Sequence, residues 1–214
     1  MLVCLAFLAM SQADFDAKRL ERVPLVGGLT DAMGMDALAD GTVDDAGEGA
    51  AATAHGDGTL STVPPGDEAS DRFTYDPADP VPTLGGNNLI IDMGVKDQRP
   101  VEERPDVLVF ETPPLREDVA IAGPVTVKLY ISSNCIDTDF TAKLIDVYPP
   151  NEDYPRGYAL NLCDGILRCR YRNSWGQATL MTPGTVYEIT IEPFATCNLF
   201  KAGHRIRLDV SSSN

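Results

Sequence analysis

The chain has 214 residues, of which 43% are hydrophobic, and its 17 lysines and arginines against 32 aspartates and glutamates give a net charge of −15. So acidic a surface repels phosphate, which argues against nucleic-acid binding and against docking on anionic membranes. The five cysteines, at positions 4, 135, 163, 169 and 197, form no Cys-x-x-Cys pair, so we expect free thiols rather than a disulfide framework or a zinc site.

The N-terminus begins with a nine-residue apolar run, Leu2–Met10, which is too short to span a bilayer. We predict the start of a helix here; the alternative is the core of a signal peptide with a cleavage site at residues 11–13. Free thiols favour a cytoplasmic protein, whereas a signal peptide would make it secreted. Imperfect helical spacing continues to residue 40, so this region is predicted to be weakly helical or disordered.

Two regions with different compositions follow one another along the chain. Residues 40–58 contain mainly glycine, alanine and acidic side chains, which is typical of a flexible linker. We therefore divide the chain into an acidic, Gly/Ala-rich N-terminal extension and linker, residues 1–55, and a second domain, residues 56–214. Prolines at 64, 65, 77, 80 and 82 impose an extended path on the start of the second domain, and residues 85–88 (GGNN) predict a tight turn.

From residue 106 onward, hydrophobic side chains recur at every second position, which predicts strands. Asp164 and Gly165 are predicted to form a hairpin turn between two of them. About seven strands separated by turn residues, with no helical run between them, predict an all-β fold, an antiparallel β-sandwich or jelly roll. The chain ends directly after a predicted strand, so we expect the sandwich to be incomplete. The predicted strands are residues 107–110, 125–131, 140–144, 160–162, 167–172, 187–191 and 206–210.

No residue is predicted to be catalytic, cofactor-binding or metal-ligating. A serine nucleophile on an α/β fold needs the turn Gly-x-Ser-x-Gly, and none of the nine serines lies in one; Ser174 comes nearest and is interpreted as a turn residue. Of the two histidines, His55 lies in the linker, where a general base could not be held in place. His204 is predicted to lie in a turn at the edge of the core, bonded to backbone groups.

Two charged clusters are interpreted as structural. Asp137 and Asp139 are predicted to cap the turn before the strand at 140–144 rather than to bind a cation, because the spacing of a calcium loop is absent. Arg168, Arg170 and Arg172 form a basic stripe on one face of a predicted strand. Three like charges in one stripe repel one another unless something opposes them, so we expect this face to contact an acidic partner domain.

Several segments, in order, resemble one known family. The set is similar to the C-terminal domain of the cocaine-esterase and X-Pro dipeptidyl-peptidase hydrolases (the CocE/NonD family), over residues 56–214. The matching segments are residues 56–61 (GDGTLS), 71–77 (DRFTYDP), 80–86 (PVPTLGG), 97–99 (DQR), 107–110 (VLVF), 137–144 (DTDFTAKL), 146–149 (DVYP), 165–168 (GILR) and 200–208 (FKAGHRIRL).

The resemblance implies a jelly-roll, galactose-binding-like sandwich that packs on an α/β-hydrolase catalytic domain, of its own parent protein or of a relative, and helps to shape its substrate cleft. Family members are serine hydrolases that cleave esters or Xaa-Pro dipeptides with a Ser-His-Asp triad and no cofactor. No residue of this chain matches that triad, so we expect an accessory domain that is inactive alone. The strand that the family places just upstream of residue 56 is replaced here by the linker.

Two other functions remain open. A stand-alone module that binds carbohydrate or peptide is the main alternative, because Tyr171 and Trp175 could stack on a sugar ring, although a core or interface position is the simpler interpretation. A regulatory form that pairs with a full-length relative is the third. An exposed apolar patch would favour a hydrolase partner, and an aromatic platform in a groove would favour the binding module.

Overall fold

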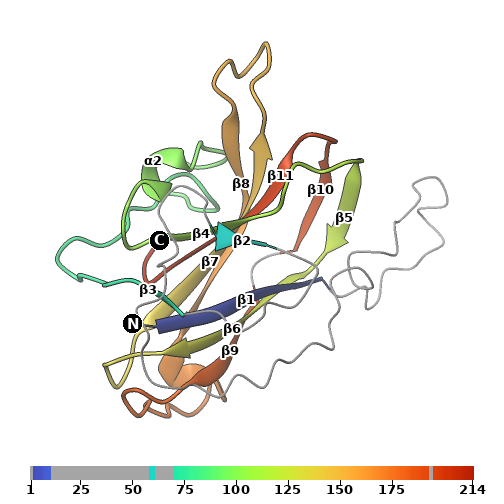
Figure 1. Cartoon of the computed structure of the whole chain (residues 1–214). Helices are drawn as coiled ribbons and strands as arrows, with labels where there is room; N and C mark the ends of the chain where they lie inside the picture. Colours follow the sequence, from blue (N-terminus) through green and yellow to red (C-terminus); the bar gives the residue numbers. More distant parts are fainter. Residues whose placement is uncertain (1, 11–57, 61–69, 193–194) are drawn as a thin grey trace.

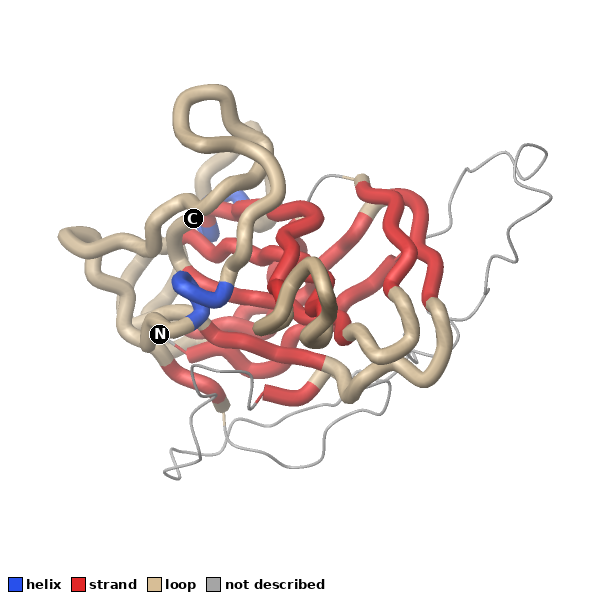
Figure 2. Tube along the Cα trace, turned by 90° about the horizontal axis from the view of Figure 1, so that it is seen from above, coloured by secondary structure: helices blue, strands red, loops and turns tan. Residues whose placement is uncertain are grey.

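The computed structural model describes residues 2–10, 58–60, 70–192 and 195–214, with residues 2–10 described by their backbone alone. The regular elements of the described chain are almost all strands, joined by long loops, and helix is confined to two short segments (Figure 2). The elements are β1 Leu2–Met10, β2 Gly58–Thr59, β3 Asp71–Arg72, α2 Arg99–Glu102, β4 Leu108–Glu111, β5 Val119–Gly123, β6 Val125–Ser132, β7 Asp139–Tyr148, β8 Tyr158–Arg168, the 3-10 helix η2 Cys169–Tyr171, β9 Tyr187–Ile191, β10 Thr196–Phe200 and β11 Arg205–Ser211.

The described strands form two larger sheets and one two-stranded sheet (Figure 1). The four-stranded sheet has the order β3-β1-β6-β9, the five-stranded sheet has the order β2-β4-β11-β7-β8, and β5 pairs with β10. Neighbouring strands are antiparallel except β2 and β4, which are parallel. The predicted all-β antiparallel sandwich is therefore confirmed.

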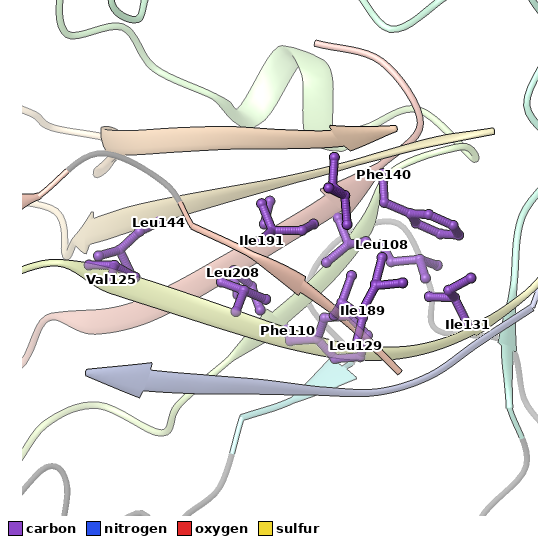
Figure 3. Packing of buried hydrophobic residues seen from close by; sticks show 14 of the residues in the cluster. Leu108, Phe110, Val125, Leu129, Ile131, Phe140, Leu144, Ile189, Ile191 and Leu208 are labelled. Carbon is purple, nitrogen blue, oxygen red and sulfur yellow. The ribbon is translucent and has the colours of Figure 1, made fainter. Parts of the chain in front are cut away.

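The main core lies between the two larger sheets (Figure 3). Along β6 every second side chain is buried, and the same alternation runs through β9 and the start of β11, as the period of two predicted. Burying one valine, leucine or isoleucine side chain, as on these strands, stabilises a fold by roughly 1.5–3 kcal/mol. The largest apolar side chains with almost no exposure are Phe140, Phe200, Leu108, Leu129, Ile131, Leu144, Ile145, Ile189, Ile191, Ile206 and Leu208.

Residues 2–10 are a strand, so the predicted start of a helix is wrong. β1 pairs along β6 from Ser132 to Val125, while β9 pairs with the other edge of β6. A helix at residues 2–10 would leave this edge of β6 without those backbone hydrogen bonds, and paired backbone groups are strongly preferred inside a protein. The predicted helical spacing of residues 11–40 and the linker at 40–58 lie outside the described residues, apart from Gly58.

Asp164 and Gly165 do not form the predicted hairpin turn. They lie inside β8, opposite Lys143 and Ala142 of β7, and the turn occurs at residues 149–157. Prolines 149 and 150 lack the N–H that would continue the ladder. Gly157 has φ +70° and a Cβ there would lie 2.7 Å from the Tyr148 carbonyl oxygen, so glycine suits this turn.

A second, smaller core covers the outer face of the five-stranded sheet. The chain between β3 and β4 crosses this face on the side where the C-terminus lies (Figure 1). Val81 and Val101 from the crossing chain pack with Val107 and Val109. The backbone N–H of Val81 also donates to the Ser213 hydroxyl at 2.8 Å. This covering segment, residues 79–107, positions the loop described next.

Candidate functional site

Residues 86–95 form a loop within the covering segment, called the apolar loop below, that exposes large hydrophobic side chains. Leu89 and Ile90 are 89% and 97% exposed. Further exposed members of the loop are Ile91, Met93 and Val95. Water contact of this much contiguous apolar surface is unfavourable, and such patches mark contact sites on soluble domains.

The apolar loop is closed at its base by a pair of backbone hydrogen bonds. Gly86 N–H donates to the Gly94 carbonyl at 2.8 Å, and Gly94 N–H donates to the Gly86 carbonyl at 3.0 Å. The adjacent Gly85 has φ +71°, and a Cβ there would lie 2.4 Å from the Gly94 carbonyl oxygen. Only glycine permits this close approach of the two stems.

The side chains of Asn88 and Asp92 bond within the loop and its stems, while the large apolar side chains point to solvent. The Asn88 side chain donates to the Gly85 carbonyl at 2.8 Å and accepts from the backbone N–H of Ile91 at 3.0 Å, as in an Asx turn. Asp92 pairs with Lys96 at 2.6 Å. The loop therefore has a folded conformation of its own.

The sequence interpretation missed this site because it took residues 85–88 as a tight turn and stopped there. Gly85 and Gly86 both have positive φ, but the chain reverses over the whole loop, from Gly86 to its bridge partner Gly94, and not within residues 85–88. The available signal was the run that follows, LIIDMGV, in which several large hydrophobic residues lie between turn residues without any period of two.

Beside the loop, α2 is joined to the sheet by a buried ion-pair network. Arg207 on β11 pairs with Glu102 of α2 at 2.5 Å and with Glu111 of β4 at 2.7 Å. Burial alone would lower the pKa of Arg207, but the two carboxylates raise it overall. Burial raises the pKa of Glu102 in spite of the opposing effect of Arg207. The guanidinium is therefore charged and holds the covering segment on the sheet.

Lys143 on β7 and Asp209 on β11 are both buried and lie opposite each other. Burial lowers the pKa of Lys143, and the nearby Asp209 opposes that shift. Burial raises the pKa of Asp209 well above its usual value, and the charge of Glu102 adds to the rise. Among the described residues, neither carboxylate oxygen of Asp209 has a hydrogen-bond partner.

The Asp209→Asn variant is expected to gain stability relative to the original chain as the pH rises. A carboxyl whose pKa is raised by folding stabilises the fold fully below its unfolded pKa, and that contribution is lost as pH rises through the folded pKa. Urea unfolding from pH 4 to pH 8 checks this, with the exposed Asp92→Asn variant as control. If the difference in unfolding free energy between Asp209→Asn and the original chain stays constant from pH 4 to pH 8, the prediction is wrong.

The structure places His204 in the turn before β11, with its ring buried against an acid. Its Nδ1 lies 2.8 Å from an oxygen of Asp146, whose other oxygen accepts from the Asn198 side chain at 3.0 Å. The Tyr148 ring packs on the imidazole at 4.3 Å between centroids. The ring thus pairs with a carboxylate rather than with the predicted backbone groups, in a closed structural cluster. His55 lies outside the described residues.

The arginine stripe does not exist as a strand face, because the strand ends at Arg168. Residues 169–171 form η2, which turns the chain. Arg168 makes a bidentate pair with Asp139 at 2.8 Å, and Arg170 pairs with Asp137 at 2.5 Å. The acidic partner expected from another domain is thus supplied by this chain. The two aspartates bind arginines, with Asp137 also accepting from the Arg170 backbone N–H.

Two other candidates lie in the loop after η2. The Ser174 hydroxyl accepts from the Gly176 N–H at 3.2 Å, which is a turn contact. The rings of Tyr171 and Trp175 stack with centroids 6.1 Å apart, and Trp175 is 75% exposed. This pair is therefore a surface feature and not part of the core.

The described residues contain no group of three or more His, Cys, Asp or Glu that could hold a metal ion. Cys135, Cys163, Cys169 and Cys197 are free, and burial raises the pKa of the Cys163 and Cys169 thiols to about 12. No helix in the described part of the chain has the length and apolar character needed to cross a membrane.

Comparison with known proteins gives a consistent set of relatives. Residues 39–214 match the family described as the X-Pro dipeptidyl-peptidase C-terminal non-catalytic domain. The chain is 50% identical over 170 residues to cocaine esterase of Rhodococcus sp. (strain MB1 Bresler), covering 78% of this chain. Among solved structures, an alpha-amino acid ester hydrolase is 35% identical with a TM-score of 0.64 over 73% of this chain. An aminopeptidase from a marine sediment archaeon, Thaumarchaeota archaeon, is 38% identical with a TM-score of 0.54 over 56% of it.

The chain corresponds to a minor part of each of these relatives. It spans 29% of the length of cocaine esterase, 27% of the ester hydrolase and 20% of the aminopeptidase. In each of them, most of the protein therefore lies outside the region matched here.

Proposed function

The chain belongs to the family of X-Pro dipeptidyl-peptidase C-terminal non-catalytic domains, and from this premise we propose that its apolar loop docks on an α/β-hydrolase catalytic domain and forms one wall of the substrate cleft. The single observation that carries the proposal is the exposure of Leu89 and Ile90 on a loop that is closed at its base by backbone hydrogen bonds. The catalytic domain supplies the triad, and this chain alone is inactive.

The position of the loop supports a contact with a folded domain. The apolar loop projects from a covering segment that is fixed to the sheet by the valine cluster and by Arg207. A contact surface whose backbone is already ordered loses little conformational entropy on binding, and that favours affinity. More than two thirds of cocaine esterase lies outside the matched region, which supports a partner of the kind found in that part of the relatives.

The substrates proposed for the assembled hydrolase are esters and the peptide bonds after N-terminal Xaa-Pro dipeptides. The names of the relatives, an esterase, an alpha-amino acid ester hydrolase and an aminopeptidase, support acyl hydrolysis as the reaction class. An apolar cleft wall strengthens contacts with an apolar acyl or leaving group, because it removes that group from water.

The test is docking in trans. The catalytic part of Rhodococcus cocaine esterase, lacking its own C-terminal domain, is mixed with this chain, and association and nitrophenyl ester hydrolysis are measured. We expect association and activity only in the mixture. The Leu89→Asp/Ile90→Asp variant is expected to weaken association by about 100-fold, because two exposed anchors of an interface are replaced by charges.

The control variant is Ile136→Asp, which places a charge on another exposed apolar residue in a turn, between β6 and β7. It is expected to dock as the original chain does. Loss of docking in this variant, with the Leu89/Ile90 variant unaffected, would move the interface away from the apolar loop. Labelling of the isolated chain by a fluorophosphonate probe would contradict its inactivity.

A second candidate function, a stand-alone carbohydrate- or peptide-binding module, is favoured by the exposed Trp175, which stacks on the half-buried Tyr171. Residues 173–177 around Trp175 carry no charge, as suits the apolar face of a neutral sugar. Trp175 is the only tryptophan of the chain, so its fluorescence reports this surface directly. A saturable fluorescence change with a neutral glycan, lost in Tyr171→Ala, would support the module; no change across a glycan and peptide panel would eliminate it.

A further inference from the structure

The buried side chain of Gln98 bonds to both stems of the apolar loop. Its Nε2 donates to the carbonyl oxygen of Leu84, before the loop, at 2.9 Å, and to that of Lys96, after the loop, at 3.1 Å. The side chain has no exposure to solvent. One amide group therefore holds the two stems together, next to the backbone pair of Gly86 and Gly94.

The oxygen of the same amide connects the loop to the five-stranded sheet. Oε1 of Gln98 accepts a hydrogen bond of 2.7 Å from Nζ of Lys143, in β7. A lysine side chain has donors only, so the oxygen must face Lys143 and the nitrogen must face the two carbonyls. The amide is thus fixed in one orientation.

The stem after the loop has further attachments to β8, one of which is the hydrogen bond of 3.2 Å that the Ala159 N–H donates to Oδ1 of Asp97. The Lys96 N–H donates to Oδ1 of Asn161 at 2.7 Å, and the Gln98 N–H donates to the Ala159 carbonyl at 2.9 Å. The stem before the loop is attached at the Leu84 carbonyl by the Gln98 side chain. Loss of that side chain would therefore free the first stem more than the second.

A buried ammonium is a costly way to gain stability, since desolvation opposes it. In the strand register the buried Asp209 lies between Lys143 and Val109 of the valine cluster. A polar joint that is satisfied in only one arrangement instead selects that arrangement.

Building on the docking proposed above, we propose that Gln98 and Lys143 are positioning residues: they lock both stems of the apolar loop to the sheet and hold Leu89 and Ile90 in the orientation that docks. The joint acts through the loop and touches neither substrate nor catalytic groups.

Hydrogen exchange on the full chain tests the joint without any partner. In Gln98→Leu, the amides of Gly86 and Gly94 are expected to exchange about tenfold faster, the size expected for losing one or two hydrogen bonds. Amides in the centres of β7 and β11 are expected to keep their rates. Gln177→Leu, which makes the same change at an exposed glutamine, is the control and should alter neither set.

A second variant guards against loss of folding. Gln98→Glu keeps an acceptor for Lys143 and removes the donors to the carbonyls of Leu84 and Lys96, so it is expected to loosen the same amides. Adding Lys143→Met to Gln98→Leu should speed the exchange of the Gly86 and Gly94 amides little further than Gln98→Leu alone, because both residues belong to one joint.

The docking assay separates a positioning role of Gln98 from a purely structural one, because a purely structural role would leave the docking affinity unchanged. If the joint selects the docking orientation, the affinity falls by the factor by which the competent fraction falls. Gln98→Leu should therefore dock more weakly than Gln177→Leu, by the factor by which its docking-competent fraction is smaller. Unchanged loop amides, or equal acceleration of the loop and the sheet, would overturn the joint. Loosened loop amides in a chain that never docks would retain the joint and overturn the proposed function.

Discussion

Replacing Arg207 with methionine is expected to lower the free energy of unfolding by about 3–5 kcal/mol, as is usual when one partner of a buried ion pair is removed. The guanidinium is the shared partner of Glu102, at 2.5 Å, and Glu111, at 2.7 Å. Without it, the buried Glu102 loses its ion pair, and among the described ion pairs Glu111 keeps only the one with Arg205, at 3.0 Å. Urea unfolding of the full chain, followed by circular dichroism, measures the change.

The matched control is Arg168→Met, which breaks an ion pair of good geometry with Asp139 at the surface. Its unfolding midpoint is expected to stay close to that of the original chain, because solvent screens exposed pairs. Equal losses in the two variants would show that burial of the Arg207 network is not what makes it stabilising. Since Glu102 belongs to α2, the Arg207 variant is also expected to loosen the covering segment and the apolar loop with it.

Truncating Phe140 to alanine is expected to destabilise the sandwich by about 3–5 kcal/mol, because a large cavity is left in a close-packed core. Phe140 has no exposure and lies between the sheets (Figure 3), with its ring edge-to-face to Phe73 at 6.5 Å between centroids. Loss of the ring removes apolar burial and an aromatic pair. Thermal and urea unfolding are the measurements.

Ile166→Ala serves as the control for this cavity, since Ile166 is 56% exposed on β8, opposite the same strand β7. It is expected to change the free energy of unfolding by no more than about 0.5 kcal/mol. A loss below about 1.5 kcal/mol in the Phe140 variant would mean that neighbouring side chains collapse into the space.

The fold was predictable where local alternation and burial coincide. Along β6, Val125, Val127, Leu129 and Ile131 are all buried, as their spacing indicated. Local signals failed at Asp164 and Gly165. An Asp-Gly pair forms a hairpin turn only where the pairing of two strands can end. The pairing of β7 with β8 ends at the prolines 149 and 150, before β8 begins, so Asp164 and Gly165 remain inside β8.

The candidate site was less predictable, because its properties depend on neighbours that are distant in sequence. The exposure of Leu89 and Ile90 depends on the covering segment lying on the outer face of the sheet, and in the sequence only the missing period of two sets their run apart from the predicted strands. Arg168 and Arg170 were correctly expected to need opposing charge, but the source of that charge, Asp139 and Asp137, depended on how β7 and β8 pair.

By itself, the sequence determined the all-β class, the main buried strand faces and the family, since alternation and motif order are properties of neighbouring residues along the chain. Tertiary structure alone decided that residues 2–10 are a strand, that the apolar loop faces outward, and that Gln98 meets Lys143. That last contact joins residues 45 positions apart. It exists because the pairing of β7 with β11 and β8 sets which face of the sheet Lys143 occupies, and the covering segment brings Gln98 onto that face. Contacts of this kind are set by strand register and layer packing, which no local pattern encodes.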